Sequence, residues 1–344
     1  MSLPLIFAIL SAVCLSVMVV LDSIMMRGCY SGQPRVAYHV TAILGFFFGL
    51  ILTVVTALTE VDGYWLNIFN QFATQEMLLL TLSGFLTIFS MRFYFELFVP
   101  SAGVKVNETA VSMWLTTIPI FVLLLAVLPS MIGSEATLFN IEQILPVLLV
   151  FITVGALVKF ESQGENVSLL LSNAAKLIAM VVISVAYLIL NEAVLEGLSR
   201  SEILSLQPYY WLGFLLGAFG LIAPSERKRF IKSLPRLKKY FIAIMLMEFL
   251  GALVYLFEVW SCEELRALQV SLILAGHVLL VFVFALVLST WREKLVGRDG
   301  VAVVPGIILD FNELPEVKVN TAKVFWLLAS VILLVTTYVL LSQV

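Results

Sequence analysis

Long apolar stretches recur along this chain and constrain its fold more than any other feature. A membrane-spanning helix needs roughly 20 mostly apolar residues to cross about 30 Å of hydrocarbon. Charged residues make up only 12% of the chain, and its mean hydropathy of +1.07 is far above that of a water-soluble domain. We therefore predict an all-α polytopic membrane bundle of ten transmembrane helices. The ten windows are 3–22, 40–59, 77–99, 109–129, 142–158, 174–195, 208–223, 240–260, 267–289 and 323–342.

The basic residues indicate an orientation, because Lys and Arg accumulate in cytoplasmic loops. The connections after the first, third, fifth, seventh and ninth windows hold 17 of the 20 Lys and Arg residues, whereas the opposite side holds two. We therefore predict that both termini lie outside, in a protein of the bacterial inner (cytoplasmic) membrane. Residues 225–239 form a basic cytoplasmic face, expected to lock the topology and secondarily to attract acidic lipid headgroups.

A small-residue pattern occurs twice and indicates an internal repeat. "ILGFFFGLI" (Ile43–Ile51) and "WLGFLLGAF" (Trp211–Phe219) share Leu-Gly, three apolar residues and Gly, and Asp22 matches Asn191 at nearly the same offset. We predict two five-helix repeats, at 1–160 and 174–344, joined by a cytoplasmic linker at 161–173, with a cytoplasmic loop at 290–322. Because five is odd, the second copy enters the membrane inverted, as in many transporters. The glycines themselves are expected to serve close helix packing.

A ten-helix chain of this kind resembles the drug/metabolite transporter superfamily, particularly its EamA-like members. The residues that carry the likeness are "FYFELFVPSAGVKVNETAVSMWLTTIPIFVLLL" with Pro119, the following Gly133-Ser134-Glu135, and Glu293 in "WREKL" of the second half. The resemblance implies a five-plus-five inverted repeat that moves small molecules by alternating access. It also implies that the third and eighth helices flank a central substrate cavity.

Four ionisable residues stand out within the predicted spans, because an unpaired charge at membrane depth costs about 2.5–3.5 kcal/mol. They are Arg92, Glu96, Glu248 and His277. We expect a midplane substrate or ion site in which Glu248 titrates or binds a cation and His277 shares its proton. Arg92 would attract an anionic substrate group or pair with Glu248. A structural interpretation stays open, with Arg92–Glu96 as a tether and Glu248–His277 as a hydrogen-bonded pair between packed helices.

Several other polar and aromatic residues are candidates for the same site. Tyr94 and Trp114 lie toward the interior of their spans and could line the cavity or simply pack. Glu258 is expected at the membrane interface. Three residues at the ends of matched helices are expected to cap those helices at the interface or to gate the cavity. They are Asp22, Asn191 and Glu192.

These features favour a secondary transporter that moves a small metabolite, with proton coupling as an option. The alternative is a non-catalytic integral membrane subunit or assembly factor of a larger complex. We do not expect an enzyme, because the only histidines are His39 and His277 and no nucleophile constellation accompanies them. The sequence indicates no cofactor, metal site or nucleic-acid partner. The expected partners are the substrate and the lipid bilayer, with a homodimer or a larger membrane complex as further options.

Overall fold

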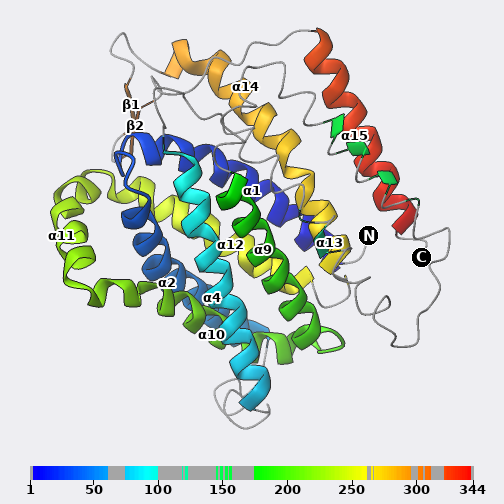
Figure 1. The fold of residues 1–344 in the computed structure, drawn as a ribbon, viewed down its shortest axis with the longest axis horizontal. Helices are drawn as coiled ribbons and strands as arrows, with labels where there is room; N and C mark the ends of the chain where they lie inside the picture. The colour runs from blue at the N-terminus through cyan, green and yellow to red at the C-terminus, as the bar shows by residue number, and fades with distance from the viewer. Residues whose placement is uncertain are drawn as a thin grey trace.

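The computed structural model describes residues 3–60, 74–99, 174–261, 265, 267–295, 301–304, 307–310 and 321–341, with isolated positions between 118 and 156. Within these residues the fold is a helical bundle with one short hairpin, shown in Figure 1. The helices are α1 (Leu3–Arg27), α2 (Pro34–Glu60), α4 (Thr74–Leu97), α9 (Ala174–Leu195), α10 (Arg200–Gly217), η1 (Ala218–Ile222), α11 (Pro224–Lys239), α12 (Phe241–Ser261), α13 (Ala267–Ala275), α14 (His277–Leu295) and α15 (Thr321–Leu341). The strands are β1 (Val301–Val304) and β2 (Ile307–Asp310).

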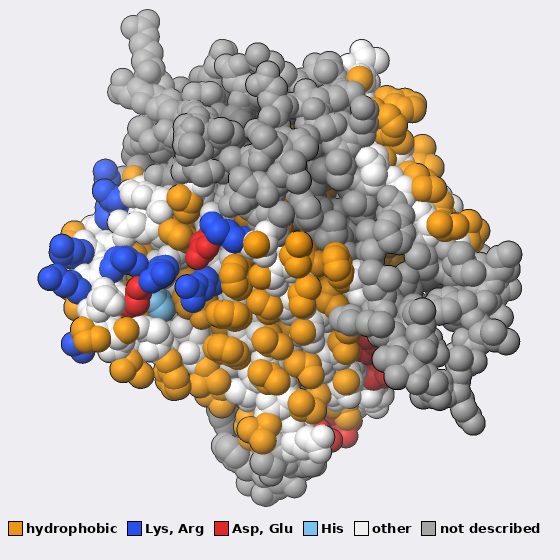
Figure 2. All heavy atoms as spheres, viewed as in Figure 1, with side chains coloured by type: hydrophobic (Ala, Val, Ile, Leu, Met, Phe, Trp, Pro, Cys, Tyr) orange, Lys and Arg blue, Asp and Glu red, His pale blue; other side chains and the backbone are white. Residues whose placement is uncertain are grey.

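Several of these helices could cross a membrane. In the described part of the chain, α1, α2, α4, α9 and α12 are long and apolar enough, and α10 with η1 and α11 makes a sixth candidate if that bent unit is one span. Large apolar side chains such as Ile51, Val55 and Leu78 are more than half exposed, as suits a surface in contact with lipid. Figure 2 shows a broad apolar face on the molecule. The membrane character predicted from the apolar windows is therefore supported.

Some predicted elements lie outside the described residues, and others differ from the structure. The windows 109–129 and 142–158 lie almost entirely outside the described residues, and the linker 161–173 lies wholly outside them. The window 267–289 is not one continuous helix, because it is interrupted at Gly276 between α13 and α14. Within the predicted loop at 290–322, β1 and β2 form an antiparallel hairpin with Val301 opposite Asp310.

The repeated glycines bring α10 into contact with two neighbours. The ring of Phe214 packs over Gly45 on α2, and the indole of Trp211 lies on Gly49. On its other side, α10 places Gly213 directly against the backbone of α4, where the backbone of Tyr210 in turn meets Gly84. Since any side chain at these glycines would separate the helices, the predicted packing role is confirmed.

Two further helix pairs flank this centre. α1 runs antiparallel to α12, because Ser11 donates to the Val254 carbonyl oxygen at 2.9 Å while Met18 lies against Gly251. α9 packs against α4 in the same manner, and Ser83 donates to the Asn191 side-chain oxygen at 2.6 Å. The hydroxyl groups thus bond polar partners inside the bundle, where water is not available to do so.

The chain turns sharply after η1, and α11 leaves α10 at an angle of 101°. Ala223 is extended and Pro224 opens the new helix, which matches the preference of proline for the first helical turn. The other end of α11 reaches the turn between α1 and α2, where Arg236 donates to the Ser31 hydroxyl. In the first turn of α11, Glu226 forms a 2.6 Å ion pair with Arg35 at the start of α2. Two basic connections that the charge pattern assigns to one side therefore lie together.

The turn between α1 and α2 also buries a thiol, Cys29, at 1% exposure. Burial raises its pKa to about 12, although nearby Arg236 opposes the shift. At pH 8 an ordinary thiol is partly ionised, so Cys29 should react with maleimide roughly a thousandfold more slowly than a free cysteine. Labelling of a Cys14→Ser/Cys262→Ser variant, natively and in denaturant, measures this ratio. Comparable rates in both conditions would show that Cys29 is accessible and ionised.

Candidate functional site

Two buried carboxyl groups meet in a small cavity within the bundle. Asp22 of α1 and Glu248 of α12 are 1% and 3% exposed, and both line a cavity of about 10 Å³. Thr41 of α2 donates to Glu248 at 2.7 Å, and Tyr94 of α4 donates to Asp22 at 3.0 Å. Four different helices thus supply the acids and their donors. The space is close to the smallest that holds one water molecule, about 10–15 Å³.

A larger cavity of about 60 Å³ lies next to the first, and the two share lining residues Met18, Met91 and Tyr255. A volume of this size holds a few water molecules. Half of its lining residues carry a polar group. The polar lining residues are Ser90, Tyr94, Ser184, Tyr187, Tyr255, Glu258, Ser271 and His277.

His277 is the first residue of α14, directly after the break at Gly276, and is completely buried. Its Nδ1 lies 2.6 Å from the Leu274 carbonyl oxygen, and its own carbonyl accepts a bond from Ser16 at 3.1 Å. The Nε2 atom has no hydrogen-bond partner in the described structure, and the residue lines the larger cavity. A buried polar atom without a partner is costly, so a water molecule or a substrate group is the expected partner there.

One face of α12 connects the two cavities. Glu248, Tyr255 and Glu258 are spaced by seven and three residues, which places them along one side of a helix. Glu258 is 2% exposed and is hydrogen-bonded by Tyr187 of α9. At a rise of 1.5 Å per residue, the two glutamates are separated by about 15 Å along the axis. The polar groups thus form a track through the core that could carry protons with the help of a few waters.

Four of the predicted site residues line these cavities, namely Asp22, Tyr94, Glu248 and His277. The predicted hydrogen bond between Glu248 and His277 is wrong, because each side chain has another partner. Glu248 is bonded to Thr41, and His277 is placed against the Leu274 carbonyl in the neighbouring cavity.

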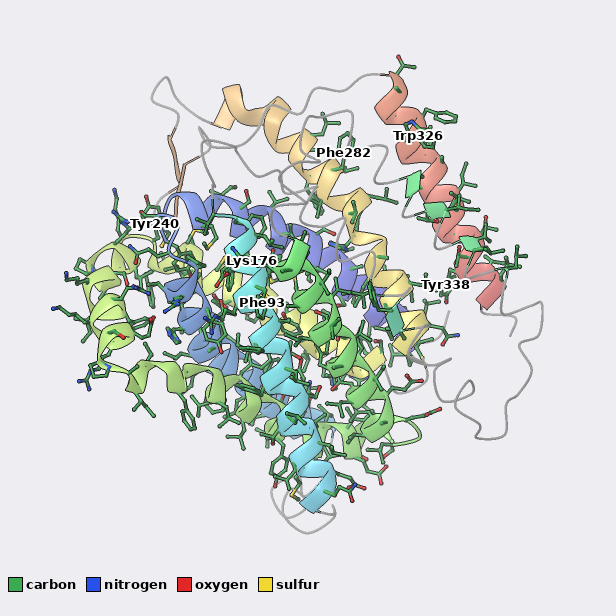
Figure 3. All side chains as sticks on the ribbon, viewed as in Figure 1. Phe93, Lys176, Tyr240, Phe282, Trp326 and Tyr338 are labelled. Carbon is green, nitrogen blue, oxygen red and sulfur yellow. The ribbon has the colours of Figure 1, made fainter. Side chains whose placement is uncertain are left out.

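Arg92 and Glu96 lie outside both cavities. The Arg92 side chain is 39% exposed and lies 3.8 Å from Glu96, which also pairs with Lys176 of α9 at 3.5 Å. These charges therefore join the end of α4 to the start of α9, where Figure 3 labels Phe93 and Lys176. The expected pairing of Arg92 with Glu248 is wrong, and the tether interpretation is the one that the geometry favours. Trp114 lies outside the described residues.

The residues predicted at helix ends are enclosed by neighbouring helices. Asp22 and Asn191 are 1% and 0% exposed, and Glu192 beside Asn191 is only half-buried. Asp22 and Glu258 line the two cavities, so Asp22 has the cavity position that the gate interpretation requires, while the interfacial position of these residues stays a prediction. The first window ended too early, because α1 continues to Arg27.

Thr41, Tyr187 and Tyr255 are site residues that the sequence reasoning missed. Thr and Tyr are frequent in apolar helices, and no local pattern separates a packed hydroxyl from one that faces an acid. The one available signal is spacing, since Tyr255 and Glu258 share a face with Glu248. Among the described residues, no group of three or more His, Cys, Asp or Glu side chains could hold a metal ion.

No protein-family model, no curated protein and no solved structure matches this chain. The arguments for function therefore depend on the geometry of the two cavities and the helices around them.

Proposed function

We propose that the protein is a secondary transporter that moves a small metabolite across the membrane by alternating access and is driven by protons. The observation that carries this proposal is the pair of carboxyl groups, Asp22 and Glu248, enclosed together between membrane-type helices. Buried ionisable residues in such helices are costly, and they commonly mark ion or proton pathways. The polar track along α12 to Glu258 and His277 supplies a route by which protons could reach a substrate in the larger cavity.

We further propose that the chain has ten spans in two inverted repeats, with the architecture of EamA-like drug/metabolite transporters. Helix pairing supports this view. If α1, α2 and α4 correspond to α9, α10 and α12, then the pair α1–α12 corresponds to α9–α4, and α2–α12 corresponds to α10–α4. All four pairs are found in the bundle, and α2 packs against α10 as elements near a twofold axis would.

The polar contacts follow the same correspondence. Asp22 of α1 faces the cavity that holds Glu248 of α12, and its counterpart Asn191 of α9 is bonded to Ser83 of α4. Each half thus places a polar side chain of its first helix against the third helix of the other half. Such cross-contacts can exchange when one half opens and the other closes, which is the basis of alternating access in repeat transporters.

The small volume of both cavities supports an occluded conformation of this transporter. A metabolite larger than a few water molecules needs more room than about 60 Å³. The break at Gly276 places a flexible point directly beside His277, so α13 and α14 could move independently to enlarge the site. In our proposal the basic side, with α11, faces the cytoplasm of a bacterium, following the distribution of Lys and Arg.

Reconstitution tests the proposal. Purified protein in vesicles should exchange one class of labelled metabolite in counterflow, and an imposed proton gradient should drive net uptake of the same compound. Protein-free vesicles give the background. Equal uptake with and without protein over a broad metabolite panel, together with stoichiometric partners in a mild purification, would favour the alternative of a membrane-complex subunit.

A further inference from the structure

A third cavity, which is lined mainly by polar residues, lies at one end of the bundle, between α11 and the turn that joins α1 to α2. Its volume is about 390 Å³, within the range of about 300–1,000 Å³ that is typical of small-ligand sites. It shares no lining residue with the acidic cavities. The residues that matter for its chemistry are Tyr30, Gln33, Arg229, Lys232, Ser233 and Arg236.

This cavity carries positive charge. Arg229 lies 3.3 Å from Glu226, which it shares with Arg35, but no carboxylate of the described residues lies within 4 Å of Lys232 or Arg236. Arg236 donates to the Ser31 hydroxyl and leaves its other donors for a ligand. The Cys29 thiol, also in the lining, stays neutral because its pKa is raised to about 12. An anion would therefore be attracted here.

The position of α11 indicates where that anion comes from. The helix turns by 101° from α10, so it runs along the membrane surface if α10 crosses the membrane. Its exposed apolar side chains, Ile231 and Leu234, lie on the face opposite Lys232 and Arg236. On the apolar side a groove of about 370 Å³ runs between α11, α2 and α12. Figure 2 shows the Lys and Arg side chains gathered at this edge of the molecule.

We propose that this cavity binds the phosphate of an anionic phospholipid headgroup. Lys232 and Arg236 neutralise the phosphate, and the apolar face of α11 rests on the acyl region. Amphipathic helices with this division of charge lie in the membrane interface and prefer anionic lipids. The proposal is independent of transport, because Lys232 and Arg236 line neither acidic cavity.

Native mass spectrometry of delipidated protein in detergent can test the site. Phosphatidylglycerol should bind at lower concentration than phosphatidylcholine of equal chain length. A Lys232→Gln/Arg236→Gln variant should weaken the phosphatidylglycerol affinity by about tenfold or more, since each basic residue near an anionic surface contributes about 1 kcal/mol.

The matched control is Lys228→Gln/Lys239→Gln, which removes the same charge from the same helix outside the cavity and should change affinity by less than about twofold at moderate salt. Unchanged melting temperatures show that each variant is folded. Equal losses in the two double variants would overturn the proposal in favour of diffuse attraction. Displacement of the lipid by millimolar inorganic phosphate would overturn the lipid assignment and leave a free-phosphate site.

Discussion

Replacing Gly84 by leucine is expected to prevent the protein from folding. A Cβ atom at this position would overlap the backbone carbonyl of Tyr210, which is part of a helix and cannot turn aside as a flexible side chain could. The helices α4 and α10 would have to move apart along their central contact. Overpacking commonly costs about 1–3 kcal/mol, and a clash with backbone belongs at or above the upper end.

Size-exclusion chromatography of a fluorescent fusion, and the melting temperature of any protein recovered, measure this loss. Gly84→Ala should be the milder version, with a lower melting temperature. Gly155→Ala is the control, because a Cβ there meets nothing within 4 Å in the described structure.

Gly213→Ala should resemble Gly84→Ala, since it disturbs the same contact from the other helix. The double variant should cost less than the sum of the two, because the contact opens only once. Normal yield and melting temperature for Gly84→Leu would contradict this arrangement of α4 and α10.

Glu248→Gln is expected to reduce proton-driven uptake to the level of protein-free vesicles. The amide keeps the shape of the side chain and can still accept the bond from Thr41, but it cannot gain or lose a proton. Counterflow, which exchanges substrate without net proton movement, should persist. Asp22→Asn should also reduce driven uptake, because Asp22 lines the same cavity and takes its own bond from Tyr94.

A parallel measurement with a pH-sensitive dye inside the vesicles shows whether protons accompany the substrate. Glu196→Gln is the matched control, since Glu196 is an exposed residue beyond the end of α9 and lines neither acidic cavity. Full driven uptake by both cavity variants would remove the carboxyl pair from the coupling mechanism. Loss of both counterflow and driven uptake in every variant, including the control, would instead indicate damaged protein.

The helix packing could be predicted from the sequence because its signal is local. Gly45 and Gly49, and again Gly213 and Gly217, repeat at a spacing of four, which leaves a smooth stripe on one side of a helix. Such a stripe indicates close contact with a neighbour whatever the rest of the fold. The structure places aromatic rings on the first pair and the backbone of α4 against Gly213.

The composition of the site could be predicted only in part, because burial depends on neighbours that a single helix does not specify. Glu248 stood out as a charge in an apolar window, and it is indeed buried. Asp22 and Glu258 lie near window ends, where charges are usually solvated, and only the packing of other helices over them makes them cavity residues. Arg92 shows the reverse, since a charge inside a window reaches the bundle surface.

The Ser83–Asn191 contact has a consequence for how the molecule responds to acid. Serine and asparagine carry no proton that is exchanged at physiological pH, whereas the corresponding region between α1 and α12 contains two carboxylic acids. Protonation in the core therefore acts on the contact between α1 and α12 and leaves the Ser83–Asn191 bond unchanged. The two helix pairs thus respond unequally to the same stimulus at their buried polar contacts.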